Sequence, residues 1–240
     1  MEDKIIGRNP VMEAIRSDRE IDKILIKKGG YEGSMVQIVK KAKSKGIIIQ
    51  EADKQKLDSI ADGGNHQGVI AFAAAHEYVS VEEMLASANG KMIIICDKIT
   101  DPHNLGSILR SANCVGAAGV IIPKRNGVGL NSVVAKTSAG AVEYTPVARV
   151  TNIAQTIDKL KDDGYWVAGA DMNGKSMYSA DLTGKIALVI GSEGDGISKL
   201  VKEKCDFTVN IPMFGEINSL NASVAAAVLM YEAVRQNQNK

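Results

Sequence analysis

Three loops of the sequence carry polar side chains that a hydrophobic core does not require, and each loop directly follows an apolar run. Guanidinium, carboxylate, carboxamide and hydroxyl groups can orient a substrate and stabilise developing charge in a reaction. Asparagine and serine also suit helix N-termini, so capping competes with direct contact for three of these residues. The loops are 97–117 with Asn104 and Arg110, 191–198 with Glu193, and 210–225 with Ser219 and Asn221.

Of these five polar residues, Arg110 is the one whose presence is least well explained by a structural role. The apolar positions around it predict a largely buried helix, with Asn104 as its N-cap. A charge inside such a helix needs a partner. We therefore expect Arg110 to take part in chemistry.

The stretch GADMNGKS at 169–176 matches the phosphate-loop pattern G-x-x-x-x-G-K-[ST]. A phosphate loop must open a helix whose N-terminal N–H groups hold the phosphates. Only MYSADL separates Ser176 from Thr183, which is too short for that helix, and no later strand ends in an Asp that could hold Mg²⁺. We interpret the stretch as a polar loop joining two strands, and we expect no NTP binding.

The glycine-rich loop GSEGDG at 191–196 is also a poor dinucleotide fingerprint. Its glycine order is G-x-x-G-x-G, and Glu193 and Asp195 would repel a pyrophosphate. The loop suits a ligand that is neutral or cationic there, although a tight strand-to-helix turn remains the alternative.

The elements that must position these loops form an α/β pattern. Continuous apolar runs separated by helical stretches predict a parallel sheet covered on both faces, with ligands at the carboxyl ends of the strands. A final helix over 219–236 is capped by Ser219 or Asn218. Its predicted core face contains Leu220, Val224, Ala227, Val228 and Tyr231. The predicted strands are 92–96, 119–123, 142–147, 166–170, 186–191 and 207–212.

The residues before this pattern predict a separate small α/β unit. We expect helices at 10–16, 34–45 and 54–61 and strands at 23–26, 47–50 and 68–73. The predicted domains are 1–73 for this unit, 74–90 for a linker that ends in a short helix, and 91–240 for the larger domain.

Composition limits the possible classes of protein. In 240 residues, 45% are hydrophobic, and 29 basic residues against 28 acidic ones give a net charge of +1. A net charge this small produces no overall electrostatic attraction for nucleic acid, so binding to RNA requires a local patch of basic residues. Neither a targeting segment nor a membrane-spanning run is visible, which predicts a cytoplasmic protein with no membrane partner. Three scattered cysteines and three histidines predict neither a metal site nor a disulfide.

Taken together, the three loops resemble the motifs of the SpoU-type (TrmH-like) RNA ribose 2′-O-methyltransferases of the SPOUT superfamily. The motifs are N-x-G-x-I-x-R-S-A at 104–112, G-S-E-G-x-G at 191–196 and I-P-M-x-G-x-x-x-S-L-N-x-S-V-A at 211–225. SAGAVEYTPV at 138–147 is also similar to this family. Ala222 stands where the family usually has Val. IGRNPVMEAI and NHQGVIA in the first unit resemble an RNA-binding domain similar to the ribosomal L30 type, which favours the RlmB-like group that acts on 23S ribosomal RNA.

The resemblance implies a C-terminal domain with a deep trefoil knot, and homodimerisation. It implies that S-adenosylmethionine binds through Gly191, Ile211, Met213 and Leu220, with no metal. S-adenosylmethionine carries a sulfonium cation and no phosphate, so it suits a glycine-rich loop that contains two carboxylates.

The implied reaction is methylation of a guanosine 2′-hydroxyl in large-subunit ribosomal RNA. Arg110 would activate the hydroxyl, with Asn104, Glu193, Ser219 and Asn221 orienting it and the nucleotide. A tRNA D-loop guanosine, an rRNA adenosine and a non-catalytic RNA-binding or ribosome-assembly role are the alternatives. The lysines at 40, 41, 43 and 45 are the expected RNA contact, unless they form a solvated helix face.

Overall fold

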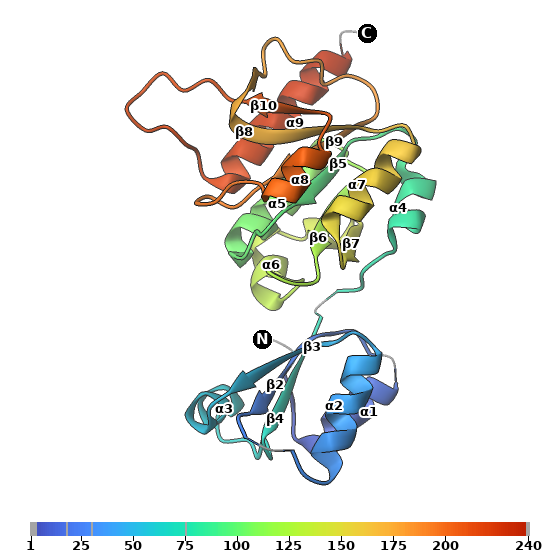
Figure 1. Cartoon of the computed structure of the whole chain (residues 1–240), viewed down its shortest axis with the longest axis vertical. Helices are drawn as coiled ribbons and strands as arrows, with labels where there is room; N and C mark the ends of the chain where they lie inside the picture. Colours follow the sequence, from blue (N-terminus) through green and yellow to red (C-terminus); the bar gives the residue numbers. More distant parts are fainter. Residues whose placement is uncertain (1–3, 18, 30, 75, 239–240) are drawn as a thin grey trace. The chain divides into compact units, whose positions relative to one another are not determined.

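The computed structural model describes residues 4–17, 19–29, 31–74 and 76–238. The ends of the predicted domains, 1–3 and 239–240, and positions 18, 30 and 75 lie outside the described residues. The chain forms two compact units, each with its own sheet (Figure 1). The first contains the residues up to Glu77, and the second begins at Tyr78 and holds most of the remaining chain.

The N-terminal unit contains a four-stranded mixed sheet in the order β1-β4-β2-β3. Strand β4 runs antiparallel to β1 and β2, whereas β2 and β3 are parallel. The side chains of β2 alternate between two cores, so that Ile24 and Ile26 face one side and Leu25 the other. The elements are β1 (Lys4–Ile6), α1 (Arg8–Arg16), β2 (Ile21–Lys27), α2 (Ser34–Ser44), β3 (Ile48–Ala52), α3 (Lys54–Ala61) and β4 (Val69–Ala73).

Each core of this unit is closed by helices. Helices α1 and α2 cover one face of the sheet with Val11, Ile15 and Ile38, all of which are almost fully buried. Helix α3 covers the other face with Leu57. The side chain of Asp53 caps α3 by accepting a hydrogen bond from the Lys56 N–H at 2.8 Å. The small unit therefore has helices on both faces of its sheet.

The second unit contains a six-stranded, fully parallel sheet in the order β10-β8-β9-β5-β6-β7. The strands are β5 (Ile93–Cys96), β6 (Gly119–Pro123), β7 (Val147–Val150), β8 (Trp166–Ser176), β9 (Ile186–Ile190) and β10 (Phe207–Asn210). The helices are α4 (Val81–Ala88), α5 (Pro102–Cys114), α6 (Ser132–Thr137), α7 (Ile153–Asp162), α8 (Lys199–Lys204) and α9 (Ala222–Gln238), with a 3₁₀ turn η1 (Ala141–Glu143).

Helices cover both faces of the larger sheet. Helices α4, α7 and α8 pack on one face, where Met84, Ile157 and Val201 join the core. On the opposite side, α5 packs against α9, and α9 packs against β9. All five residues of β9 are buried. None of the helices that the structure describes is long and apolar enough to cross a membrane.

These findings confirm the α/β class, the parallel C-terminal sheet and the small N-terminal α/β domain. The knotted chain path remains a prediction. Two expected segments were wrong. The 142–147 segment is not a strand. Residues 142–143 belong to the η1 turn, which follows Gly140 at φ +86°, and residues 144–146 lie in no helix or strand. Strand β7 begins only at Val147, directly after Pro146, which has no N–H for a ladder. The 169–176 segment, expected as a loop, is part of the 11-residue strand β8 and forms all of it after Ala168.

The predicted orientation of the last helix was also wrong. Its buried residues are Ala222, Ala226, Leu229, Met230, Glu232 and Ala233. Val224 is 47% exposed and Tyr231 54% exposed, so the predicted core face is largely the outer one. The helix is apolar on both sides, and its sequence therefore does not identify the stripe that faces the sheet.

Candidate functional site

A cavity of about 510 Å³ lies where strands β9 and β10 of the larger sheet end, beside the strand β8 between them. Its wall includes the ends of β9 and β10, at Ile190 and Asn210, and the middle of β8, at Asp171. The segment that leads into α9 closes the cavity. Because these strands are parallel, their carboxyl ends meet at one edge of the sheet, as the sequence predicted.

The glycine-rich loop forms one wall of this cavity. Two backbone hydrogen bonds close it, from the Gly196 N–H to the Ser192 carbonyl at 3.0 Å and from the Ser192 N–H to the Gly196 carbonyl at 3.2 Å. A Cβ atom on Gly191 would lie 2.1 Å from the carbonyl carbon of Gly196. Only glycine permits this approach, which fixes the loop and the position of Glu193.

Glu193 joins two other segments of the chain in one hydrogen-bond network. Its Oε1 accepts from Asn104 Nδ2 at 2.8 Å, from Asn221 Nδ2 at 2.5 Å and from the Ala222 N–H at 3.4 Å. Asn221 Nδ2 also donates to Asn104 Oδ1 at 2.9 Å. The three side chains come from α5, the loop after β9 and the start of α9. A carboxylate accepting several N–H donors forms strong, charge-assisted bonds, so this network holds the three loops together.

The local structure assigns the capping roles differently from the sequence. Asn221 caps α9, since its Oδ1 accepts from the Ser223 N–H at 3.0 Å and the Val224 N–H at 3.3 Å. Ser219 and Asn218 were the expected caps, and the sequence could not rank these neighbouring candidates. Asp101, not Asn104, caps α5 by accepting from the His103 N–H at 2.9 Å. Asn104 is therefore a buried residue inside the helix, free to bond Glu193.

Arg110 lies outside this network. The apolar positions of α5 are buried, but Arg110 itself is exposed. Its side chain makes no hydrogen bond or ion pair with any residue that the structure describes. The expectation that it needs an internal partner was therefore wrong, because position 110 is turned away from the buried side of the helix. An exposed guanidinium retains all five N–H donors for another molecule.

The cavity brings together the residues expected to hold a cofactor. Gly191, Ile211, Met213 and Leu220 all line it, and so do Glu193 and Ser219. Asn104, Arg110 and Asn221 are not part of its wall.

The sequence reasoning missed several residues of the wall, namely Ala170 to Asn173 on β8 and Asn210 on β10. Residues 171–173 directly follow the predicted 166–170 strand, which was the available signal, whereas Asn210 lies inside the predicted 207–212 strand. Burial favours a raised pKa for the Asp171 carboxyl, but the hydrogen bond and charge of Lys202 and the Asn173 N–H outweigh it. The pKa of Asp171 is therefore lowered. Lys202 Nζ lies 2.6 Å from Asp171 Oδ2, so the carboxylate stays ionised and fixed.

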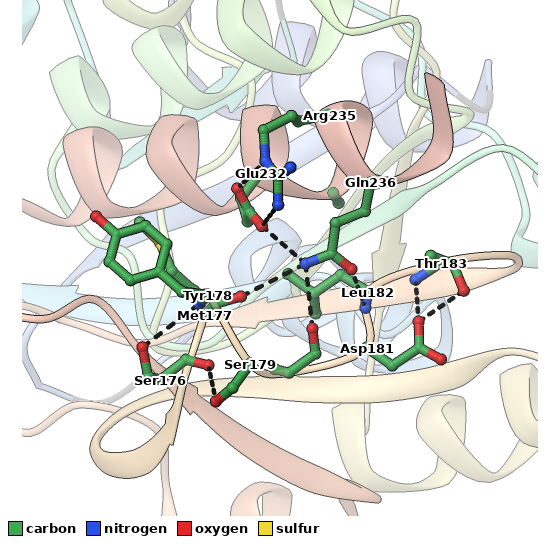
Figure 2. A network of polar contacts seen from close by, with 12 residues as sticks. Ser176, Met177, Tyr178, Ser179, Asp181, Leu182, Thr183, Glu232, Arg235 and Gln236 are labelled. Atoms are coloured by element: carbon green, nitrogen blue, oxygen red, sulfur yellow. Dashed lines mark hydrogen bonds and ion pairs between the residues drawn. The ribbon is translucent and has the colours of Figure 1, made fainter. Parts of the chain in front are cut away.

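The far end of α9 is tied to the segment after β8 (Figure 2). Gln236 Nε2 donates to the carbonyl of Ala180 at 3.1 Å, and Gln236 Oε1 accepts from the Leu182 N–H at 2.9 Å. Arg235 forms two hydrogen bonds with Glu232, at 2.8 Å and 2.7 Å. These bonds hold the helix that Asn221 caps.

In the part of the chain that the structure describes, no group of three or more His, Cys, Asp or Glu side chains could hold a metal ion. The 169–176 stretch opens no helix, because the next element after β8 is β9. A Cβ atom on Gly174 would lie 2.6 Å from the backbone of Thr208 on β10. This glycine therefore serves strand packing, which argues against a phosphate loop.

Comparisons with known proteins match both units. The family described as the SpoU rRNA Methylase family matches residues 91–231, and the family described as RNA 2′-O ribose methyltransferase substrate binding matches residues 4–79. The Bacillus subtilis (strain 168) protein YacO, whose name places it in the TrmH family of tRNA/rRNA methyltransferases, is 47% identical over 239 residues, covering 98% of this chain and 96% of YacO.

Two further relatives extend the comparison. A Staphylococcus aureus (strain COL) protein with the same family name is 49% identical over 247 residues, covering 100% of this chain and 98% of the relative. The crystal structure of the SpoU methyltransferase AviRb from Streptomyces viridochromogenes, in complex with AdoMet, aligns with a TM-score of 0.63. It covers 99% of this chain and 91% of AviRb at 23% identity, which shows a shared fold.

Proposed function

The chain belongs to the SpoU rRNA methylase family, and from this premise we propose that it methylates the ribose 2′-hydroxyl of a guanosine in 23S ribosomal RNA. Membership establishes the coarser activity, which is methyl transfer from S-adenosylmethionine to an RNA ribose, in tRNA or rRNA. The observation that carries the finer proposal is the N-terminal match to a substrate-binding domain, because a tRNA D-loop enzyme needs only short extensions there.

The cavity fits S-adenosylmethionine in size and in chemistry. Ile211, Met213 and Leu220 offer apolar surface to an adenine ring, and the carboxylates of Asp171 and Glu193 favour a cationic sulfonium over a phosphate. The buried Asn210 Oδ1 has no hydrogen-bond partner among the residues that the structure describes, so this wall residue offers an acceptor to a ligand. When bound, the cofactor supplies an electrophilic methyl group.

The task of the protein's own residues is to position a 2′-hydroxyl and stabilise it as it loses its proton. A guanidinium is effectively always protonated in proteins, so Arg110 does not act as the base. Arg110 instead binds the phosphate of the target nucleotide and the developing alkoxide. Its exposure and its freedom from partners among the described residues support this role. A neighbouring phosphate, a water molecule or a second subunit receives the proton.

Asn104, Glu193 and Asn221 act as positioning residues. Their network joins helix α5, which carries Arg110, to the loop that forms the cavity wall. A change at any of the three therefore alters both the cofactor site and the direction of Arg110. Ser219, which lines the cavity on the segment before α9, contacts the nucleotide or the cofactor.

The protein acts as a homodimer in the cytoplasm under this proposal. The outer face of α9 supports the dimer, because Val224 and Tyr231 are about half exposed on a helix with little charge. Leu220, just before this helix, is 36% exposed. Phe214 and Ile217 on the preceding segment are 91% and 76% exposed. A second copy of this chain would cover this apolar surface and bring residues toward the site.

Methylation of defined RNAs tests the target class. Purified protein and labelled methyl donor are incubated with an unmodified 23S rRNA transcript and, separately, with an unmodified tRNA pool. The proposal predicts label in the rRNA transcript and little in the tRNA. Label in tRNA alone would overturn the rRNA target and leave the coarser activity intact.

A further inference from the structure

The N-terminal unit contains a polar cleft of about 1040 Å³ that takes no part in the site described above. It lies between the start of α1, the end of β2, the start of α3 and the turn before β4. Tyr31 and Asn65 also line it. The role inferred below for this cleft rests on the proposed function, which requires the protein to bind a large RNA.

The charges around this cleft favour an anion. Four cationic side chains line it, against the two carboxylates of Glu32 and Asp58. Asp58 is already engaged, since its Oδ1 lies 2.9 Å from His66 Nε2. The cations form no ion pair with any residue that the structure describes. They are Arg8, Lys27, Lys28 and Lys54.

Arg8 is held in a fixed direction by the turn before β4. Its Nε donates to the Gln67 carbonyl at 3.0 Å, and its backbone N–H donates to Gln67 Oε1, also at 3.0 Å. The two terminal amino groups of the guanidinium make no hydrogen bond to a described residue. A guanidinium oriented through Nε loses less entropy when it binds a phosphate with its remaining donors.

The turn itself is built to keep this geometry. His66 is 8% exposed, and its Nδ1 accepts from the Gly68 N–H at 2.9 Å. The proton of the neutral ring therefore lies on Nε2, which donates to Asp58. Gln67 has φ +48° and Gly68 has φ +83°, left-handed conformations that this tight turn requires. The cleft is thus a preformed site.

The lysines that the sequence analysis favoured for RNA have a different setting. Lys40, Lys41 and Lys43 are exposed on α2, and none of them lines this cleft. Lys45 Nζ donates to the Ile15 carbonyl within the same unit. A solvated helix face offers charge but no shaped site.

We propose that this cleft binds an unpaired segment of the RNA substrate. Phosphodiesters lie against Arg8, Lys27, Lys28 and Lys54, and a base lies beside the Tyr31 ring. The Tyr31 hydroxyl, which donates to Glu51 Oε1 at 2.6 Å, fixes that ring. RNA loops offer unstacked bases that pair well with an aromatic ring and flanking cations.

Two triple variants that change the net charge equally test this proposal. One is Lys27→Gln/Lys28→Gln/Lys54→Gln in the cleft, and the matched control is Lys40→Gln/Lys41→Gln/Lys43→Gln on α2. Affinity of the full-length protein for an unmodified 23S rRNA transcript is measured without methyl donor at several salt concentrations. All six lysines are exposed, so thermal melting should show that both proteins fold. If the cleft variant melts lower, Lys28→Gln and Lys54→Gln are measured singly.

The expected effect follows from counterion release. Each phosphate contact on a single strand contributes about 0.7 to the slope of log affinity against log salt, or roughly fivefold in affinity near 0.1 M salt. The cleft variant should lose at least about tenfold in affinity and about 2 in slope, whereas the control stays within about threefold. Equal losses in both variants, or a loss only in the control, would overturn the proposal.

The outcome is separable from that of the proposed function. If the protein binds and methylates tRNA instead of rRNA, the rRNA target is wrong, and the same two variants measured on tRNA still decide the role of the cleft. If the wild-type protein binds neither RNA, the cleft proposal fails as well. Normal RNA binding with no methyl transfer would refute only the proposed function.

Discussion

Replacing Asn221 by aspartate tests the network that joins the three loops. The substitution keeps the shape of the side chain but removes both donors of Nδ2. One donor bonds Glu193 Oε1 at 2.5 Å, and the other bonds Asn104 Oδ1 at 2.9 Å. The introduced carboxylate would place a negative oxygen directly against Glu193. The cap of α9 survives, because the oxygen that accepts from the Ser223 N–H remains.

The cost can be worked from these distances. Two unit charges about 3 Å apart repel by about 3 kcal/mol at an effective dielectric of about 40, which suits a partly exposed pair. Loss of the two hydrogen bonds adds about 1 kcal/mol each, and side-chain rearrangement offsets part of the sum. We expect a destabilisation of about 2–4 kcal/mol, or a fall of roughly 5–10 °C in melting temperature.

Urea unfolding of Asn221→Asp measures this cost, and a second substitution provides the control. In Asn221→Asp/Glu193→Gln the new amide can donate to the new carboxylate, which removes the repulsion. A turn of the Asn104 amide by about 180° lets its Nδ2 donate to residue 221 and its Oδ1 accept from residue 193, which restores the donor and acceptor pairing. The double variant should recover most of the lost stability. A single variant as stable as the wild type, or a double variant less stable than the single one, would refute the reasoning.

Arg110, the cysteines and Glu232 each carry a further prediction. Arg110→Lys should lower methyl transfer by at least about tenfold while binding of the methyl donor is unchanged, because lysine keeps the charge but loses the fork; near-normal activity would exclude this role for the guanidinium. Burial raises the pKa of Cys96 to about 12 and of Cys205 to about 11. Iodoacetamide at about pH 8 should therefore label only the exposed Cys114 in the native protein, and labelling of Cys205 would contradict this. The hydrogen bond from Arg235 lowers the pKa of Glu232 below its usual 4.5. This stabilisation is present above that value and is lost as pH falls below it, so Glu232→Gln should destabilise the fold at neutral pH and much less at about pH 3, as urea titrations at both pH values would show; an equal cost at both would contradict it.

Much of the fold could be predicted because the signals are local. The strands β5, β6 and β9 are short apolar runs buried on both faces, and their sequence alone shows this. Helix α3 begins after Asp53, a good cap, and was predicted with its observed bounds.

The errors arose where distant parts of the chain decide the structure. Residues 169–176 of β8 look like a polar loop, but Gly169, Lys175 and Ser176 pair with β10, which comes about 30 residues later. The exposure of Arg110 and the outward face of α9 depend on how helices pack, which periodicity does not determine. The close approach at Gly191 likewise depends on two backbone segments that the sequence cannot place.

The site was predictable as a set of residues but not as a geometry. The sequence identified Asn104, Glu193 and Asn221 as polar residues after apolar runs, and the structure joins these three by hydrogen bonds. The side-chain partners themselves could not be inferred, because residues 104 and 221 are separated by 117 positions. Their catalytic roles remain predictions.

Transfer of labelled methyl groups to total RNA tests the central claim most directly. RNA from cells that lack this gene is incubated with the protein and labelled S-adenosylmethionine, separated into ribosomal and transfer fractions, and digested to nucleosides, with Arg110→Ala in parallel. The account predicts label in 2′-O-methylguanosine from large-subunit RNA, lost in the variant. Absence of label from ribosomal RNA, despite binding of the methyl donor, would contradict it.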